Sequence, residues 1–259
     1  MRHQAPWISA EGATYRVSWY ESGAGPAMVW LHGGGGTGKD FWYQLKAFGT
    51  RWRVLAPDLP GFGRSDWPPE IRGVQDLPDF LARWLATLGV KAAVVGGNSM
   101  GGRVALAYAA RYPDRVTHLI LIDSVGLDLP GVPVQNPLAV PPQRFLETLV
   151  HRPTQYLQHT PYRTVEDAQE LSRGRQSFAR YLAASPIVQE PGLLWEQVAM
   201  PTLVVWGRED RIVPLAYGEA LAARLPRARL VVFDACGHLP HLEWPERFNQ
   251  TVAAFLAEA

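Results

Sequence analysis

The sequence predicts an α/β fold in which a mostly parallel sheet of about eight strands is covered by helices on both faces. Short apolar runs typical of buried strands alternate along the chain with segments whose apolar residues recur every three or four positions, as in amphipathic helices. The stretch between Ile122 and Pro201 interrupts this alternation because it contains no convincing strand. That interruption predicts a helical insertion.

The expected strands begin with an edge hairpin, in which the loosely alternating segment Gly12–Tyr20 pairs with the residues before it. Six further strands are short apolar runs: Met28–Leu31, Arg53–Ala56, Ala92–Val95, Thr117–Ile122, Leu203–Trp206 and Leu230–Phe233. In a parallel sheet the loops after the strands meet at one edge, where sites of α/β proteins form. Functional residues are therefore expected in these loops.

Helices are expected between most of the strands, at Asp40–Phe48, Leu77–Leu88, Met100–Arg111, Leu215–Leu225 and Glu246–Leu256. The insertion contains a proline-rich stretch, 130–142, and then helical patterns at Arg144–Val150 and Val165–Leu182. We expect it to form a helical cap over the site. The predicted division is a core of residues 1–126 and 196–259 and a cap of residues 127–195.

The composition excludes several classes of protein. The chain has 259 residues, of which 47% are hydrophobic, enough for one large core. Its net charge of +1 comes from 25 basic and 24 acidic residues without a block of either sign, so neither nucleic acid nor an anionic membrane is the expected partner. There is one cysteine, no signal-peptide pattern and no apolar run of membrane-spanning length. We expect a cytoplasmic monomer or homodimer that acts on a small molecule.

One serine stands between glycines in the segment Gly96–Gly102, at the junction of an expected strand and an expected helix. Gly97 and Gly101 lack the Cβ atoms that would collide in a turn this sharp. Such a turn exposes the serine oxygen at the carboxyl edge of the sheet. Ser99 is therefore the candidate nucleophile.

A serine hydroxyl needs a base that takes its proton and a carboxylate that orients the base. Both residue types follow in the chain. Asp210 lies in the loop after the strand Leu203–Trp206, and His238 lies in the loop after the strand Leu230–Phe233. The two side chains are expected at the same sheet edge as Ser99.

Two other acids compete with Asp210 for the orienting role. Asp123 follows the strand Thr117–Ile122 and also ends near the expected cleft. Glu209 directly precedes Asp210. We expect Asp210 to orient the base, with Asp123 as the alternative and Glu209 as a solvated charge of the loop.

Four segments in this order resemble those of α/β-hydrolases over nearly the whole chain: His32–Gly36, Asp58–Asp66, Gly97–Gly101 and Gly237–Phe248. The resemblance implies a triad of Ser99 as nucleophile, Asp210 as acid and His238 as base. It also implies an oxyanion hole formed by the backbone N–H groups of Met100 and of Gly34 or Gly35.

The resemblance further implies hydrolysis of a small carboxylic ester or related acyl bond through an acyl-enzyme, without a metal or an organic cofactor. His241 lies three residues beyond His238, but a metal site would need further ligands, so His241 is expected to be structural. Cys236 is expected to pack in the core. The residues expected to line the substrate pocket are His32, Trp42, Phe62, Phe145, Phe178 and Leu239.

The alternative function is hydrolysis of a carbon–carbon bond. The segment Gly97–Gly102 is similar to that of enzymes that cleave ring-fission products of aromatic degradation. This chain departs from their pattern at Leu239, where they carry tryptophan, and it lacks their Gly-Pro-Gly-Ala element in the oxyanion loop. Their cap arginine corresponds to Arg173 or Arg175.

Two alternatives come from other classes. The segment Gly33–Lys39 satisfies most of a phosphate-binding loop, and Leu119–Asp123 imitates the second motif of nucleoside triphosphatases. However, Asp40 stands where such a loop needs a hydroxyl for magnesium, and this function leaves Ser99 and His238 unexplained. The other alternative is a ligand-binding receptor that retains the hydrolase fold.

Overall fold

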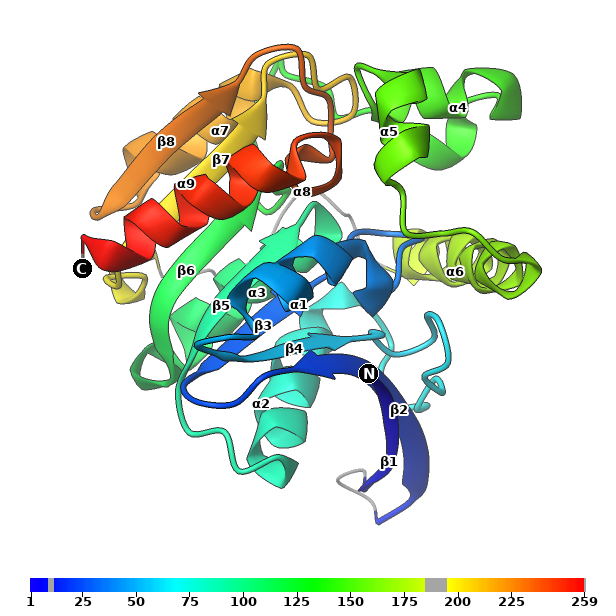
Figure 1. Ribbon diagram of the computed structural model, residues 1–259, viewed down its shortest axis with the longest axis vertical. Coiled ribbons are helices and arrows are strands. Elements are labelled where there is room, and N and C mark those ends of the chain that lie inside the picture. The colour runs from blue at the N-terminus through cyan, green and yellow to red at the C-terminus, as the bar shows by residue number, and fades with distance from the viewer. Residues whose placement is uncertain (9–11, 185–194, 259) are drawn as a thin grey trace.

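The computed structural model describes residues 1–8, 12–184 and 195–258 of the chain. In this part, eight strands form one sheet in the order β1-β2-β4-β3-β5-β6-β7-β8, as Figure 1 shows. Their bounds are Arg2–Ile8 (β1), Thr14–Ser22 (β2), Ala27–Leu31 (β3), Arg53–Pro57 (β4), Ala93–Asn98 (β5), Val116–Ile122 (β6), Thr202–Gly207 (β7) and Ala228–Phe233 (β8). Strands β3 to β8 run parallel, and β2 runs antiparallel to its two neighbours, β1 and β4. The predicted mostly parallel sheet is confirmed.

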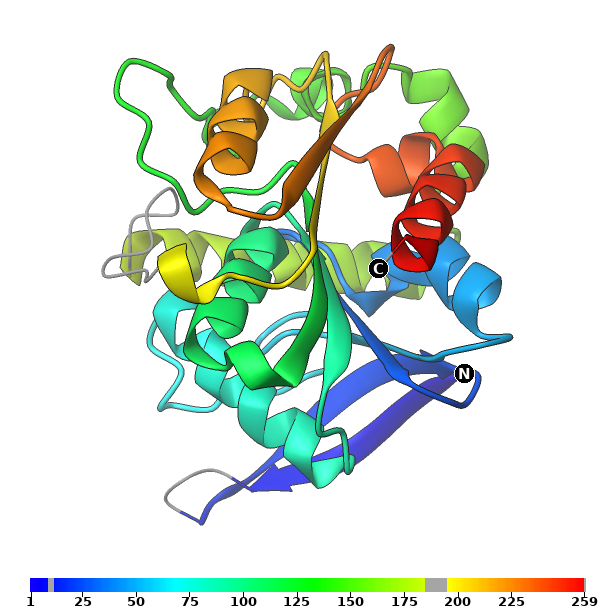
Figure 2. The same ribbon diagram turned by 90° about the vertical axis from the view of Figure 1, so that its left-hand side faces the viewer.

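Helices cover both faces of the sheet (Figure 2). One face packs against α1 (Trp42–Phe48) and α9 (Pro245–Ala257), and the other against α2 (Leu77–Thr87), α3 (Met100–Arg111) and α7 (Leu215–Arg224). The central strands β3, β5 and β7 are buried along their whole length. A strand covered on both sides has no solvent face, so its sequence is continuously apolar instead of alternating.

In the described residues between β6 and β7 there are three α-helices: α4 (Pro142–Leu149), α5 (Pro153–His159) and α6 (Val165–Ala184). They lie to the right of the sheet in Figure 1. Helix α5 was not expected, because seven residues are too few to display a helical period clearly. Residues 185–194 of the predicted cap, and residues 9–11 of the predicted hairpin, fall outside the described residues.

Short helical turns complete the described part: η1 (Gly38–Phe41), η2 (Val74–Asp76), η3 (Pro113–Arg115), η4 (Pro137–Ala139), η5 (Trp195–Gln197) and α8 (Pro240–Glu243). The segment Asp40–Phe48, expected as one helix, is divided into η1 and α1. The hydroxyl of Thr37 accepts the N–H of Lys39 at 3.2 Å, which begins a tight turn before the α-helix. None of the described helices is both long and apolar enough to cross a membrane.

Ion pairs fix α6 to the rest of the protein. Glu170 is 1% exposed and accepts two hydrogen bonds from Arg2, at 2.7 and 2.9 Å, and one from Arg64 at 2.8 Å. The guanidinium of Arg2 also binds Asp58 at 2.7 Å. Strand β1, the loop after β4 and α6 therefore meet in one charged cluster, which positions the helix beside the loops at the sheet edge.

Candidate active site

Ser99 occupies the sharp turn between β5 and α3. Its backbone has φ 54° and ψ −116°, an unusual conformation for a residue with a side chain. A Cβ at Gly97 would collide with the backbone of Gly101, and a Cβ at Gly101 would collide with the carbonyl groups of Leu31 and His32. Glycine at both positions lets the turn close, so that Ser99 stands at the end of the central strand.

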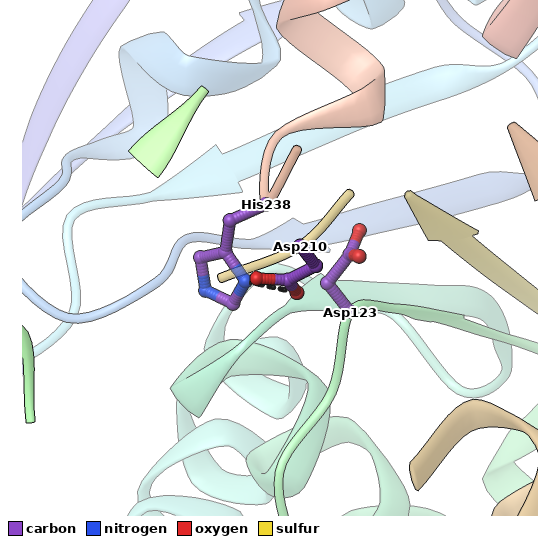
Figure 3. A group of neighbouring side chains, drawn as sticks. All are labelled: Asp123, Asp210 and His238. Carbon is purple, nitrogen blue, oxygen red and sulfur yellow. Dashed lines mark hydrogen bonds and ion pairs between the residues drawn. The ribbon is translucent and has the colours of Figure 1, made fainter. Parts of the chain in front are cut away.

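His238 and Asp210 form a buried hydrogen-bonded pair at the same edge (Figure 3). The His238 Nδ1 atom lies 2.7 Å from Asp210 Oδ2. Asp210 Oδ1 accepts the N–H groups of Ile212 at 2.7 Å and Val213 at 3.0 Å. Because all these contacts need an acceptor, Asp210 is arranged as a carboxylate that receives the N–H of the imidazole. Nε2 of His238 is then the nitrogen left to act as the base.

The backbone of His238 is also held on both sides. Its N–H donates to the carbonyl of Leu149 at the end of α4, at 2.9 Å. Its carbonyl accepts Nδ2 of Asn98, the residue before Ser99, at 3.0 Å. The position of the histidine therefore depends on both the turn that contains Ser99 and the inserted helices.

Ser99 and His238 line one cavity of about 720 Å³. Among the described residues, no hydrogen bond joins Ser99 Oγ to the His238 ring, and such contacts are often loose until a substrate binds. Gly34 and Gly35 line the same cavity. Met100 is the first residue of α3, so its backbone N–H has no partner within that helix. These groups suit a developing oxyanion beside Ser99.

The structure pairs His238 with Asp210 and gives the two competing acids other contacts. Asp123 Oδ1 accepts the N–H of Gly207 at 2.9 Å, and its Oδ2 has no partner in the described part of the chain. Burial and the neighbouring Asp210 raise the pKa of Asp123 well above its usual range, which favours its neutral form. Glu209 accepts the N–H of Cys236 at 2.9 Å and closes the histidine loop.

Asp123, Asp210 and His238 each offer one ligand atom, and these atoms lie within 4.8 Å of one another. The donor set does not fit a metal ion. His238 Nδ1 already points at Asp210, both Asp210 oxygens have hydrogen-bond donors, and three ligands leave a structural site incomplete. The contacts of the cluster are instead those of an Asp210 carboxylate that orients the imidazole ring of His238.

The cavity lining contains three of the six predicted pocket residues: Phe145, Phe178 and Leu239. The other three, His32, Trp42 and Phe62, do not line it. His32 is buried under the loop that it supports, with its ring 2.8 Å from the Gly33 carbonyl and 3.0 Å from the Leu59 N–H. Phe62 packs against His32 and Tyr181, and Trp42 faces Lys46 on the surface of α1. Aromatic residues near a motif need not point into the site, because the core competes for them.

Of the two arginine candidates on α6, Arg175 lines the cavity and Arg173 does not. Arg175 stacks over the Phe145 ring, 4.9 Å from its centroid. Arg173 is exposed. Gly174 between them packs against the Gly35 carbonyl, which brings α6 close to the glycine loop.

Lys39, the last residue of the segment that resembles a phosphate-binding loop, forms an ion pair. Its Nζ lies 2.6 Å from Asp167 Oδ1 on α6.

The turn η1 also contains a cavity residue that the sequence did not indicate. Asp40 is buried, lines the cavity and accepts the hydroxyl of Tyr162 at 2.6 Å. In the sequence, its only signal was a charged residue directly after a glycine loop.

His241 and Cys236 are buried outside the cavity lining. His241 stacks on Phe41, with ring centroids 4.8 Å apart, and burial lowers its pKa to about 3. Burial raises the pKa of Cys236, which makes it an inert thiol.

The geometry can be compared with known proteins. A model of the alpha/beta hydrolase family matches residues 28–251. The chain belongs to this family. A 2-hydroxy-6-oxononadienedioate/2-hydroxy-6-oxononatrienedioate hydrolase of Burkholderia vietnamiensis is 36% identical to this alpha/beta hydrolase, over 96% of this chain and 93% of the relative. A 2-hydroxymuconate semialdehyde hydrolase of Pseudomonas putida is 35% identical over 99% and 96% of the two chains.

Among solved structures, a thermophilic esterase from Thermogutta terrifontis matches this alpha/beta hydrolase with a TM-score of 0.80. The two proteins are 27% identical, over 100% of this chain and 98% of that chain. The named relatives are hydrolases, and the chain is an enzyme of the same serine hydrolase type.

Proposed function

We propose that this protein hydrolyses a carbon–carbon bond in small 2-hydroxy-6-oxo-dienoates, the ring-fission products of aromatic compounds. The observation that carries the proposal is the identity of 35 and 36% to two hydrolases named for such compounds, over nearly the whole chain. The alternative function from the sequence is thus better supported than ester hydrolysis.

The reaction needs a nucleophile, a base that moves protons and donors for an oxyanion. Breaking a carbon–carbon bond leaves an electron pair on carbon, so the substrate enol must first become a ketone, with a proton moved to the carbon beside the scissile bond. The electron pair then delocalises into the new ketone. A base within reach of the substrate can move these protons.

Ser99 is the proposed nucleophile for this bond. Its oxygen attacks the ketone while His238 takes its proton, and Asp210 holds the imidazole in the tautomer that leaves Nε2 free. The negative oxygen is stabilised by the N–H groups of Met100 and of Gly34 or Gly35. Collapse breaks the carbon–carbon bond, His238 returns the proton to the leaving dienolate, and water then hydrolyses the acyl-enzyme.

Residues 127–195 act as the cap that selects the substrate in this proposal. Helices α4 and α6 supply Phe145, Arg175 and Phe178 to the cavity. The guanidinium of Arg175 suits the carboxylate of a dienoate, and the aromatic side chains suit its apolar end. A cavity of about 720 Å³ has room for a compound of this size.

Ester hydrolysis is the second candidate. It is favoured by the likeness to a thermophilic esterase and by Leu239, which makes the wall beside His238 apolar where the carbon–carbon hydrolases carry tryptophan. The same triad and oxyanion donors serve both reactions, so substrate preference decides between them.

The test compares 2-hydroxy-6-oxo-6-phenylhexa-2,4-dienoate, the compound named for one relative, with 4-nitrophenyl butyrate. We expect a higher kcat/KM for the dienoate, and a loss of roughly three or more orders of magnitude in Ser99→Ala with both compounds. Efficient turnover of the ester with none of the dienoate would replace the proposal by the second candidate.

A further inference from the structure

Asp40 is a buried acid that the proposed mechanism does not use. Within the described part of the chain, it is the one carboxylic acid among the cavity-lining residues. Its Oδ1 accepts the hydroxyl of Tyr162 at 2.6 Å, and that hydroxyl also contacts Thr37 Oγ1 at 2.9 Å. Its Oδ2 lies against Gly36, where a Cβ would collide with it. The carboxyl group is thus fixed beside the glycine loop at the cavity wall.

The groups around Asp40 give its carboxylate little compensation for burial. Lys39, its neighbour in the chain, is paired with Asp167 at 2.6 Å. Asp58, on the loop after β4, adds a like charge that is itself held by Arg2. His241 on α8 is neutral near pH 7 because burial lowers its pKa to about 3. Tyr156 and Tyr162 also lie near Asp40, and burial raises the pKa of each hydroxyl above its usual range.

This environment brings the pKa of Asp40 close to neutral pH. Burial raises the pKa of Asp40 to about 7, although the hydrogen bonds from Tyr162 and the Thr37 backbone lower it in part. The carboxyl group is therefore mostly neutral below pH 7 and mostly charged above it. Arg175 adds a guanidinium group to the same lining.

We propose that Asp40 is a charge-selecting residue of the substrate cavity, whose neutral form admits an anionic substrate and whose charged form disfavours one. This inference deepens the proposed function and rests on it, because dienoates carry a carboxylate. A like charge in a partly desolvated cavity costs far more than in water. The preference for anionic over neutral substrates should therefore fall as pH rises.

The test uses two 4-nitrophenyl esters that differ at one end, the pentanoate with a terminal methyl and the glutarate monoester with a terminal carboxylate. The ratio of their kcat/KM values, glutarate over pentanoate, is measured from pH 6 to 8.5. The same triad cleaves both esters, so any pH dependence that the triad gives to turnover cancels in the ratio. The glutarate carboxyl is ionised over this whole range.

In the wild type, the ratio should fall by roughly tenfold or more, with a midpoint near pH 7. Asp40→Asn should keep a high ratio that does not change with pH. Tyr162→Phe removes a hydrogen bond that favours the carboxylate, so its midpoint should move to higher pH. The control Asp66→Asn changes an exposed acid outside the cavity lining and should keep the wild-type profile.

A wild-type ratio that stays flat from pH 6 to 8.5, or an Asp40→Asn variant that keeps the wild-type fall, would overturn the role of Asp40 while leaving the serine hydrolase in place. Release of 4-nitrophenol from neither ester would also overturn the charge-selecting role, because the cavity would then admit neither acyl chain, while turnover of the dienoate separately decides the proposed function.

Discussion

The carboxyl groups of Asp123 and Asp210 lie side by side in the buried end of the site, with facing oxygen atoms within 4.8 Å of each other. Asp210 has three hydrogen-bond donors and faces His238, whereas Asp123 has only the N–H of Gly207 in the described part of the chain. Two buried carboxylates this close cannot both ionise at low cost. The proton therefore stays on Asp123, and the two acids differ in role.

We predict that Asp210→Asn lowers kcat roughly a thousandfold or more, because an amide favours the wrong imidazole tautomer. Asp123→Asn should change kcat only a fewfold, since the amide replaces an acid whose neutral form is favoured by burial. Steady-state kinetics on the substrate with the higher turnover would measure both. A larger loss at Asp123 would transfer the orienting role to that residue.

Asp123→Asn should also change how stability depends on pH. Because the folded-state pKa of Asp123 is raised, its ionisation in the unfolded chain lowers folding stability as pH rises above about 4. Asparagine never ionises, so the variant should gain on the wild type by about 1.4 kcal/mol for each pH unit until the folded-state pKa is reached. Urea unfolding of both proteins at pH 5, 6 and 7 measures this gain. An offset that is the same at every pH would contradict a neutral Asp123.

Glu170→Gln should loosen α6. Glu170 is 1% exposed, and its carboxylate pairs with the guanidinium groups of Arg2 and Arg64. Removing this buried negative charge should lower the free energy of unfolding by about 2–4 kcal/mol. Since α6 contributes Arg175 and Phe178 to the cavity, KM should rise as well. The matched control is Glu166→Gln on the same helix: Glu166 also pairs with Arg64 but is 63% exposed, so its loss should cost less than about 0.5 kcal/mol. Equal effects of the two variants would argue against the buried cluster as the anchor of α6.

Lys39→Ala should leave turnover within a fewfold of the wild type, because Lys39 binds Asp167 and not a phosphate group. Asp167 keeps the N–H groups of Arg163 and Thr164 at 2.8 and 2.9 Å. Magnesium-ATP should leave Tm unchanged in a thermal melt. A saturable rise in Tm that disappears in Lys39→Ala would reveal a phosphate site by mass action.

The sequence alone determined the mostly parallel sheet, because buried strands and amphipathic helices leave local periods in the chain. It also placed Ser99, Asp210 and His238 after three different strands, and parallel strands end at a common edge. Only the tertiary structure showed which acid faces His238. Asp123, Glu209 and Asp210 have similar local signals, and the choice among them depends on loops that are distant in sequence.

The tertiary structure alone also decided what points into the cavity. Arg173 and Arg175 are equivalent in the sequence, but residues two apart on a helix face different directions, so only Arg175 lines the cavity. Trp42 and Phe62 pack elsewhere, while Asp40 lies in the lining because the turn η1 and the segment before α6 bring it against Tyr162. Local periodicity records whether a residue is buried, whereas the identity of its neighbours is set by long-range packing that one sequence does not display.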